Sequence, residues 1–302
     1  MTVCIAAACD SGRAIVTATD GLLSLGDVVG DTMAAKIIWK GEWQIMFAGA
    51  PANTAMILAE IDELILQNQD SLSRRRVQQT VRSAFMKCAA RMSSFEALLP
   101  FDMTLEQFKK EGLTTLGEPM HNDIAHNIRS AARQIGEQLL VTGWGHTPAS
   151  AMLYEIGAYG DYNHSYSGTA AIGSGGPTAQ SSLLILGQSR DRTLSETIFN
   201  VAMAKFASEK SGGLTVGQKT AMYVSRKAVE GDPRQFHAEP LLEEEISQLR
   251  NVWDEHVRPK MPLEGCLVSN RISQRIKGSV EISDVVDVLK RSIRVDPQTR
   301  AE

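Results

Sequence analysis

Two hairpins are predicted at the start of the chain by short apolar runs that turn residues separate. Residues 2–9 and 13–19 are rich in small apolar and β-branched side chains, with an Asp-Ser-Gly turn signal at 10–12 between them. A similar pair of runs spans 35–40 and 43–48. The chain is therefore expected to open with two antiparallel strand pairs.

Beyond residue 49 the apolar residues take the spacing of amphipathic helices. Residues 55–65 and 74–97 show this spacing, which favours two long helices. The stretch 98–121 contains two prolines and two glycines around a short helical piece near Leu105–Lys110, so we interpret it as an insertion. Helical spacing returns at 123–136.

The second half of the chain again places strands before helices. The predicted strands are 137–143, 150–157 and 168–172, the helices are 177–188 and 193–209, and a further strand lies at 219–229. Strands in two groups, with helices between and after them, predict an α+β fold of two antiparallel sheets covered by helices on the outside, a four-layer αββα sandwich. We place this domain at residues 1–235 and expect 236–302 to be a mostly helical C-terminal extension packed on or beside it.

Charge and apolar content argue against two classes of partner. The 302 residues carry a net charge of −4, so no basic excess would attract nucleic acid or an anionic membrane surface. No apolar run approaches the roughly 20 residues of a membrane span. We therefore expect no nucleic-acid partner and no membrane partner.

The reactive side chains favour a reduced, cytoplasmic protein without a cofactor. The four cysteines have the spacing of neither a disulfide framework nor a zinc site, and the six histidines form no H-E-x-x-H pattern. The N-terminus lacks the features of a signal peptide. There is no glycine-rich lysine loop for phosphate, so the chain is not expected to hydrolyse ATP itself.

Thr2 is a candidate nucleophile, because a threonine at a mature N-terminus combines a nucleophile and a general base. The hydroxyl attacks, and the free α-amine, whose ordinary pKa is about 7.7–8.0, accepts the proton. Removal of Met1 would free that amine, and a residue as small as threonine at position 2 permits the removal. A Met-Thr start is common, so its meaning depends on the rest of the chain.

Asp20 and Lys36 carry the charges that such a site needs. A lysine beside the threonine hydroxyl would lower the proton affinity of the hydroxyl and of the amine, and an aspartate paired to it would hold it in place. Taken alone, the same two residues also fit a surface turn carboxylate and a lysine whose amine reaches solvent.

The spacing of these residues resembles that of proteasome β-subunits and of the bacterial heat-shock proteasome-like peptidase, which are N-terminal nucleophile (Ntn) hydrolases. Asp20 and Lys36 stand sixteen residues apart, as the catalytic Asp and Lys of those families do. Residues 46–49 (MFAG) are similar to the family's strand ending in Ala-Gly, which implies that the Gly49 amide forms the oxyanion hole. Without a substrate, Gly49 would be a strand-to-helix turn glycine.

The segment 171–180, AIGSGGPTAQ, is similar nearly letter for letter to the part of the bacterial peptidase that carries a serine supporting the threonine amine. The resemblance implies that Ser174 would bond the amine of Thr2 and relay its proton. The segment fits neither the dinucleotide G-x-G-x-x-G pattern nor the G-x-S-x-G elbow, because Thr178 and Ile172 stand where glycines are required. A glycine-rich turn without a catalytic role is the other interpretation.

The chain departs from the family pattern at two places. Ser211 begins a Ser-Gly-Gly that resembles the family's later one, whose serine contacts the amine, but Ser208 replaces the family's Asp three residues earlier. Either the adjacent Glu209 takes that role, or the role is lost and Glu209 lies at a solvated helix end. The first hairpin is also slightly longer than the family's; an insertion at the 10–12 turn would be harmless, whereas one within the first strand would move Thr2 away from Lys36.

The resemblance, which covers roughly 2–66 and 137–229, implies a threonine-type peptide or amide hydrolase. It also implies a self-compartmentalised homo-oligomer whose subunits stack in rings and which a separate ATPase unfoldase could feed. A stand-alone small-molecule amidase is a second hypothesis, which the 98–121 insertion and the C-terminal region favour. An inactive structural subunit, in which Met1 is retained, is a third.

Overall fold

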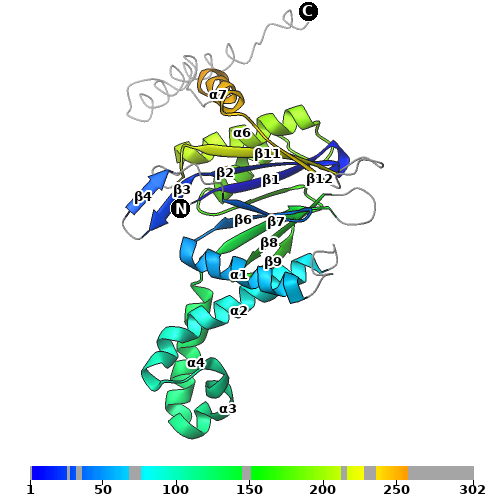
Figure 1. Ribbon diagram of the computed structural model, residues 1–302. Helices are drawn as coiled ribbons and strands as arrows, with labels where there is room; N and C mark the ends of the chain where they lie inside the picture. The colour runs from blue at the N-terminus through cyan, green and yellow to red at the C-terminus, as the bar shows by residue number, and fades with distance from the viewer. Residues whose placement is uncertain are drawn as a thin grey trace, which may run out of the picture. The chain divides into compact units, whose positions relative to one another are not determined.

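Two five-stranded antiparallel sheets form the centre of the protein (Figure 1). The computed structural model describes residues 2–25, 28–31, 36–67, 76–144, 151–211, 216–227 and 236–257. One compact unit reaches to Glu255. None of the helices in these ranges is long and apolar enough to cross a membrane.

The first sheet has the strand order β10-β1-β2-β11-β12. Its strands are β1 Cys4–Cys9, β2 Ala14–Asp20, β10 Thr169–Ile172, β11 Thr220–Lys227 and β12 Phe236–Pro240. The β1–β2 ladder runs without a bulge from Cys4 opposite Thr19 to Cys9 opposite Ala14. The additional length of the first hairpin therefore lies in its turn, Asp10–Gly12, where all three residues have positive φ.

The second sheet has the strand order β5-β6-β7-β8-β9. Its strands are β5 Ile37–Lys40, β6 Trp43–Ala48, β7 Gln138–Gly143, β8 Met152–Gly157 and β9 Gly160–Asn163. A small hairpin, β3 Leu22–Leu25 with β4 Val28–Asp31, forms a sheet of its own. The sequence pattern did not predict β3, β4 or β9, which are only four residues long each.

Helices cover the outer face of each sheet. Helices α5 (Gly176–Ile185) and α6 (Leu194–Ser211) pack on the first sheet, whereas α1 (Pro51–Gln67) and α2 (Val77–Leu98) pack on the second (Figure 1). Helix α7 (Glu243–Val252) packs against α6 and continues into one π-helical turn, Trp253–Val257. The predicted four-layer αββα sandwich is confirmed.

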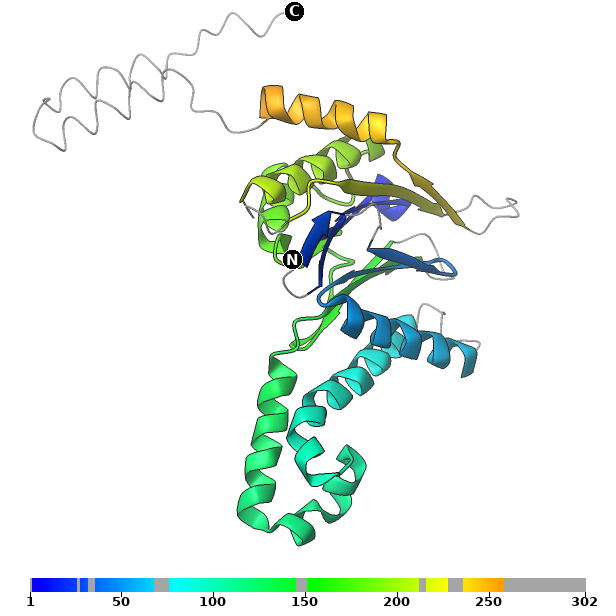
Figure 2. The ribbon, with the colours of Figure 1, turned by 60° about the vertical axis from the view of Figure 1, so that its left-hand side comes forward.

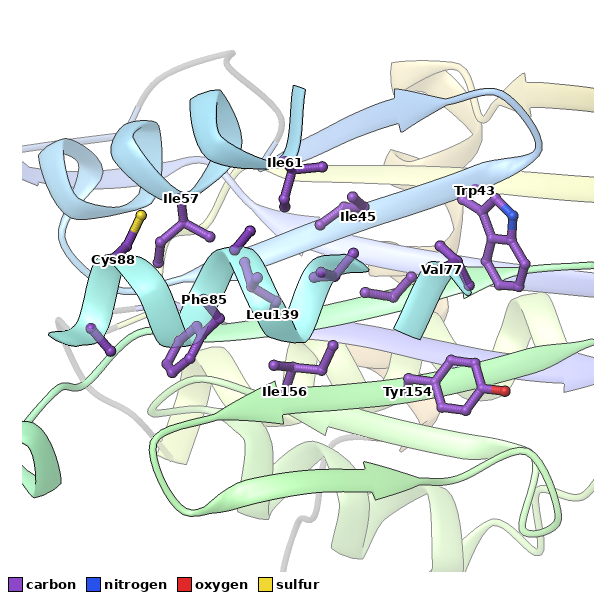
Figure 3. Packing of buried hydrophobic residues seen from close by; sticks show 14 of the residues in the cluster. Trp43, Ile45, Ile57, Ile61, Val77, Phe85, Cys88, Leu139, Tyr154 and Ile156 are labelled. Carbon is purple, nitrogen blue, oxygen red and sulfur yellow. The ribbon is translucent and has the colours of Figure 1, made fainter. Parts of the chain in front are cut away.

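Alternate residues of the second sheet serve two separate cores. Ile45, Leu139 and Ile156 point toward α1 and α2 and pack against Ile57 and Phe85 (Figure 3). The neighbouring residues Met46, Leu140 and Leu153 face the first sheet. Because both faces of these strands are buried, they read as nearly continuous apolar runs rather than as alternating ones.

The predicted insertion is a longer helical structure than expected. It contains α3 (Leu105–Leu116), and it leads into α4 (Glu118–Arg133), which overlaps the helix predicted at 123–136. The two helices pack on each other and on α2 (Figure 2). Phe108 and Ile124 form a small core there with Leu98. A capping box at Thr104, with Gln107 as its partner, begins α3, and its Thr-x-x-Gln pattern is a helix-start signal in the sequence itself.

The region after residue 235 begins with a strand that the sequence pattern did not predict. Residues 236–240 form β12, which pairs with β11 as the edge strand of the first sheet, before α7 begins. The boundary at residue 236 stays a prediction, and residues 258–302 of the expected helical extension lie outside the described residues.

Phe85→Ala should destabilise the fold strongly, because Phe85 is 1% exposed between α2 and the second sheet. Loss of a buried phenyl ring costs about 3–5 kcal/mol, measured as the free energy of unfolding in urea. Tyr166→Ala is the control, since Tyr166 is 96% exposed, and it should cost less than about 0.5 kcal/mol. Equal losses in the two variants would contradict this account of the core.

Candidate active site

Thr2 lies two residues before β1 and makes hydrogen bonds through both its side chain and its backbone. Lys36 Nζ donates to Thr2 Oγ1, and the Thr2 backbone nitrogen donates to Ser174 Oγ at 3.2 Å. The Thr2 carbonyl accepts from the Gly175 N–H at 3.1 Å. Thr2 is only 4% exposed. These contacts bring together segments that are 34 and 172 residues away in the sequence.

Asp20 is a fully buried carboxylate at the end of β2. Its Oδ1 accepts from Lys36 Nζ at 3.1 Å and from the Val3 N–H at 3.0 Å, and its Oδ2 accepts from the Gly217 N–H at 3.0 Å. A buried charge without such donors would be very costly. Asp20 therefore fixes the start of β1, the lysine and the segment before β11 at the same time.

Lys36 immediately precedes β5 and is 3% exposed. Its Nζ bonds to both Thr2 Oγ1 and Asp20 Oδ1, so the ammonium bridges the hydroxyl and the carboxylate. The Lys36 carbonyl accepts from the Phe47 N–H at 3.3 Å, which ties the lysine backbone to β6. The interpretation of Asp20 and Lys36 as surface residues is wrong.

Ser174 lies in the turn between β10 and α5 and is itself exposed. The preceding Gly173 has φ of +84°, and a Cβ at that position would lie 2.3 Å from the Thr2 carbonyl oxygen. Its N–H donates to Gln138 Oε1 at 2.8 Å. Glycine is therefore required here by both the backbone conformation and the close approach of Thr2.

Gly49 follows β6 and is also exposed. Its φ is +136°, and a Cβ would lie 2.9 Å from Glu137 Cγ, so this position likewise requires glycine. No residue in the described part of the chain accepts a hydrogen bond from the Gly49 N–H. Ala48, the preceding residue, packs beside Gly173, which places the end of β6 next to the segment that holds Thr2.

The Ser211 hydroxyl makes its hydrogen bonds away from Thr2. Its hydroxyl donates to Thr178 Oγ1 at 2.9 Å and is exposed at the end of α6. The role implied for Ser211 at the amine stays a prediction. The glycines that follow it, residues 212 and 213, lie outside the described residues.

Glu209 is buried rather than solvated, so the interpretation as a solvated helix end is wrong. It is 7% exposed and accepts from Lys205 Nζ and from the guanidinium of Arg250. Ser208, at the position of the family's Asp, is fully buried and bonds the carbonyls of Gly175 and Ala204.

Several residues that shape the site were missed by sequence reasoning. Gly217 and Val3 act through backbone N–H groups, which leave no residue-type signal. Gln138 holds Gly173, and Glu137, which accepts from Asn53 Nδ2 at 2.7 Å, packs against Gly49. Both side chains stand at the start of the predicted strand 137–143, where a polar pair before an apolar run could have marked them.

Cys4 is the other side chain with nucleophilic chemistry close to Thr2 in sequence. It is fully buried, and its Sγ donates to the Phe47 carbonyl at 3.3 Å. Burial raises the pKa of the Cys4 thiol far above its ordinary value, with the charge of Asp20 adding to the shift. The thiolate is therefore disfavoured. No group of three or more His, Cys, Asp or Glu side chains in the described ranges is placed to hold a metal ion.

Solved structures share this architecture at low sequence identity. The Anbu complex from Pseudomonas aeruginosa, determined as a helical assembly, matches with a TM-score of 0.59 and 14% identity over 87% of this chain and 99% of that one. Anbu (ancestral beta-subunit) from Yersinia bercovieri matches with a TM-score of 0.57 and 14% identity over 87% and 100%. The Gly-1 mutant of Anbu from Hyphomicrobium sp. strain MC1 gives 0.53 and 16% over 85% and 95%.

The chain has the Ntn-hydrolase fold. The resemblance to proteasome β-subunits that the sequence suggested is thus confirmed at the level of the fold. No protein-family model matches the sequence, and no curated protein matches it. In this chain the fold places the start of β1 beside the ends of β2 and β6, which is where Thr2, Asp20 and Gly49 are found.

Gly173→Ala should destabilise the protein more than Gly117→Ala, although both glycines have similar positive φ values of +84° and +75°. At Gly117 a Cβ meets nothing within 4 Å, so the variant carries backbone strain alone, about 1–3 kcal/mol. At Gly173 the collision with the Thr2 carbonyl adds about 1–3 kcal/mol. Urea unfolding of both variants checks this, and equal losses would mean that Thr2 is not held against Gly173.

Proposed function

We propose that the chain is a threonine-type amide or peptide hydrolase whose nucleophile is Thr2 after removal of Met1. The observation that carries the proposal is the convergence of Lys36 Nζ on the Thr2 hydroxyl and of Ser174 Oγ on the Thr2 nitrogen. A surface threonine with a structural role would need neither a buried ammonium at its hydroxyl nor a serine at its backbone nitrogen. This arrangement fits a nucleophile whose own amine serves as the base.

In the first half of the reaction, Thr2 Oγ1 attacks the carbonyl carbon of the scissile amide. The hydroxyl proton passes to the α-amine of Thr2 and then to the leaving nitrogen, so that an amine departs and an ester on Thr2 remains. In the second half, the α-amine takes a proton from water, the hydroxide attacks the ester, and the carboxylic acid leaves as Thr2 is restored. Ser174, within hydrogen-bond distance of the Thr2 nitrogen, orients the amine.

The charges around Thr2 favour this chemistry. The Lys36 ammonium stabilises negative charge that develops on Thr2 Oγ1, and Asp20 holds the ammonium in place. The Gly49 N–H would stabilise the oxyanion of the substrate. Gly49 and Ser174 are exposed whereas Thr2, Asp20 and Lys36 are buried, so a substrate would approach from the side of the two former residues.

Thr2→Ala should abolish hydrolysis of fluorogenic peptide amides, because it removes the hydroxyl nucleophile and leaves the N-terminal amine. The rate is expected to fall by at least about three orders of magnitude. Alanine is as small as threonine for the purpose of Met1 removal, so the two proteins can be compared directly. Thr2→Ser, which keeps a hydroxyl, should retain measurable turnover.

Intact-mass measurement accompanies this experiment, because the base is a free α-amine. The active protein should lack Met1. Turnover by a protein that retains Met1, or unchanged turnover in Thr2→Ala, would contradict the proposal. Retained Met1 without turnover would favour the inactive structural subunit.

We also propose that the chain forms a homo-oligomer. Large apolar side chains are exposed along α2 and the 98–121 insertion, where a second subunit could cover them. They are Met86, Phe95, Leu99, Phe101, Leu113 and Met120. The Anbu complex from Pseudomonas aeruginosa is a helical assembly, which supports the same behaviour for a chain of this fold.

Light scattering should give a mass several times that of the 32.9 kDa chain. The double variant Phe95→Ser/Leu99→Ser should lower that mass, because it removes two exposed apolar contacts of the insertion region. Tyr166→Ser is the matched control, since Tyr166 is 96% exposed but lies between β9 and β10, outside this region. A monomeric wild-type protein would contradict assembly and would favour the stand-alone amidase.

A further inference from the structure

We propose that the buried pair Lys205–Glu209 on α6, joined to α7 by Arg250, is a positioning device for the catalytic carboxylate of Asp20. The inference rests on the proposed function, in which Asp20 holds Lys36 at the nucleophile. The hydrogen bonds of Thr2 go to Lys36, Ser174 and Gly175 rather than to this group, so its three members would act through the segment that precedes β11.

Gly217 connects the device to Asp20. The Gly217 N–H donates to Asp20 Oδ2 at 3.0 Å, and the Gly217 carbonyl accepts from Lys205 Nζ at 2.8 Å. The same residue is thus held on one side by the catalytic carboxylate and on the other by a buried ammonium. A shift of Gly217 would turn the Asp20 carboxylate, whose other oxygen bonds Lys36.

Lys205 is fully buried and is kept there by its partners. Its Nζ donates to Glu209 Oε1 at 2.5 Å. Desolvation lowers the pKa of Lys205, while the negative charges of Glu209 and Asp20 raise it and Arg250 lowers it. The ionisable groups that act on this ammonium therefore come from α6, from β2 and from α7. Glu209 is the one that also bonds to it directly.

Arg250 extends the device to α7. Its guanidinium makes two hydrogen bonds to Glu209, at 2.6 and 3.0 Å, and donates to the Gln218 carbonyl at 2.9 Å. It also stacks over the Phe206 ring, 4.2 Å from its centroid. Two successive carbonyls, those of Gly217 and Gln218, are each held by a cation.

A purely structural role would not require this choice of side chains. Buried ion pairs contribute little to stability relative to well-packed apolar residues, because desolvation offsets their attraction. Here both cations are aimed at the short segment whose N–H group reaches Asp20. The geometry fits a requirement for accurate placement of that segment.

Glu209→Gln tests the device in the full-length protein with a fluorogenic peptide amide as probe. Loss of the carboxylate frees Gly217 to move, so kcat should fall about ten- to a hundredfold, while KM changes less than about twofold. The alkaline limb of the kcat–pH profile should move to lower pH, because Lys205 loses the charge that keeps it protonated. Glu60→Gln is the matched control, since Glu60 is a buried carboxylate paired with Lys87 on the other helical layer.

The outcomes separate this inference from the proposed function. If Thr2→Ala is inactive but Glu209→Gln has the same kcat and the same kcat–pH profile as Glu60→Gln, the positioning role is overturned and the threonine mechanism stands. If Thr2→Ala retains turnover, both fall. A Glu209→Gln variant with a lower kcat but an unshifted alkaline limb would also overturn the role, because a general loss of stability would then explain the lower kcat.

Arg250→Gln keeps the inference testable if Glu209→Gln does not fold. Arg250 is partly exposed, and its loss removes the donor to the Gln218 carbonyl. We expect a severalfold lower kcat without a large change in KM, compared with Arg82→Gln, which removes an arginine paired with Asp161 on the second sheet. Equal kcat values in these two variants would count against the device.

Discussion

The burial of the Asp20 carboxylate is the constraint on which the site depends. A fully buried negative charge is tolerated only when cations and N–H donors surround it, and three such donors come from Val3, Lys36 and Gly217. They are the residue before β1, the residue before β5 and a residue of the segment before β11. Neutralising one charge thus brings the start of the first strand, a lysine and a distant segment into one place.

Small side chains make this convergence possible. Strand β1 reads CIAAAC and is buried along its whole length between α6 and the second sheet, so bulky residues there would separate the layers. Gly173 allows Thr2 to approach closely, because the Thr2 carbonyl occupies the space that a side chain at this position would fill. The packing of the two sheets and the approach of Thr2 to Ser174 therefore follow from the same choice of small residues.

The sequence predicted the layers and the residues with distinctive chemistry, but not the connections between them. Apolar runs and turns located β1, β2, β6, β7 and both long helix pairs, and motif spacing located Thr2, Asp20, Lys36 and Ser174. Strands of four residues, such as β9, are too short for a pattern to stand out from a turn. Gly217 acts through its backbone, and the burial of Glu209 depends on Arg250, which lies 41 residues away. Contacts of this kind arise only from the tertiary fold.

Charges of alternating sign run from Thr2 to α7. Lys36 is followed by Asp20, Lys205, Glu209 and Arg250, and the Gly217 backbone bridges Asp20 and Lys205. The four innermost charges cancel, so the row can be buried without net charge, and only the last cation is partly exposed. In such a row the field at Thr2 depends on every member, because removal of one leaves its neighbour uncompensated.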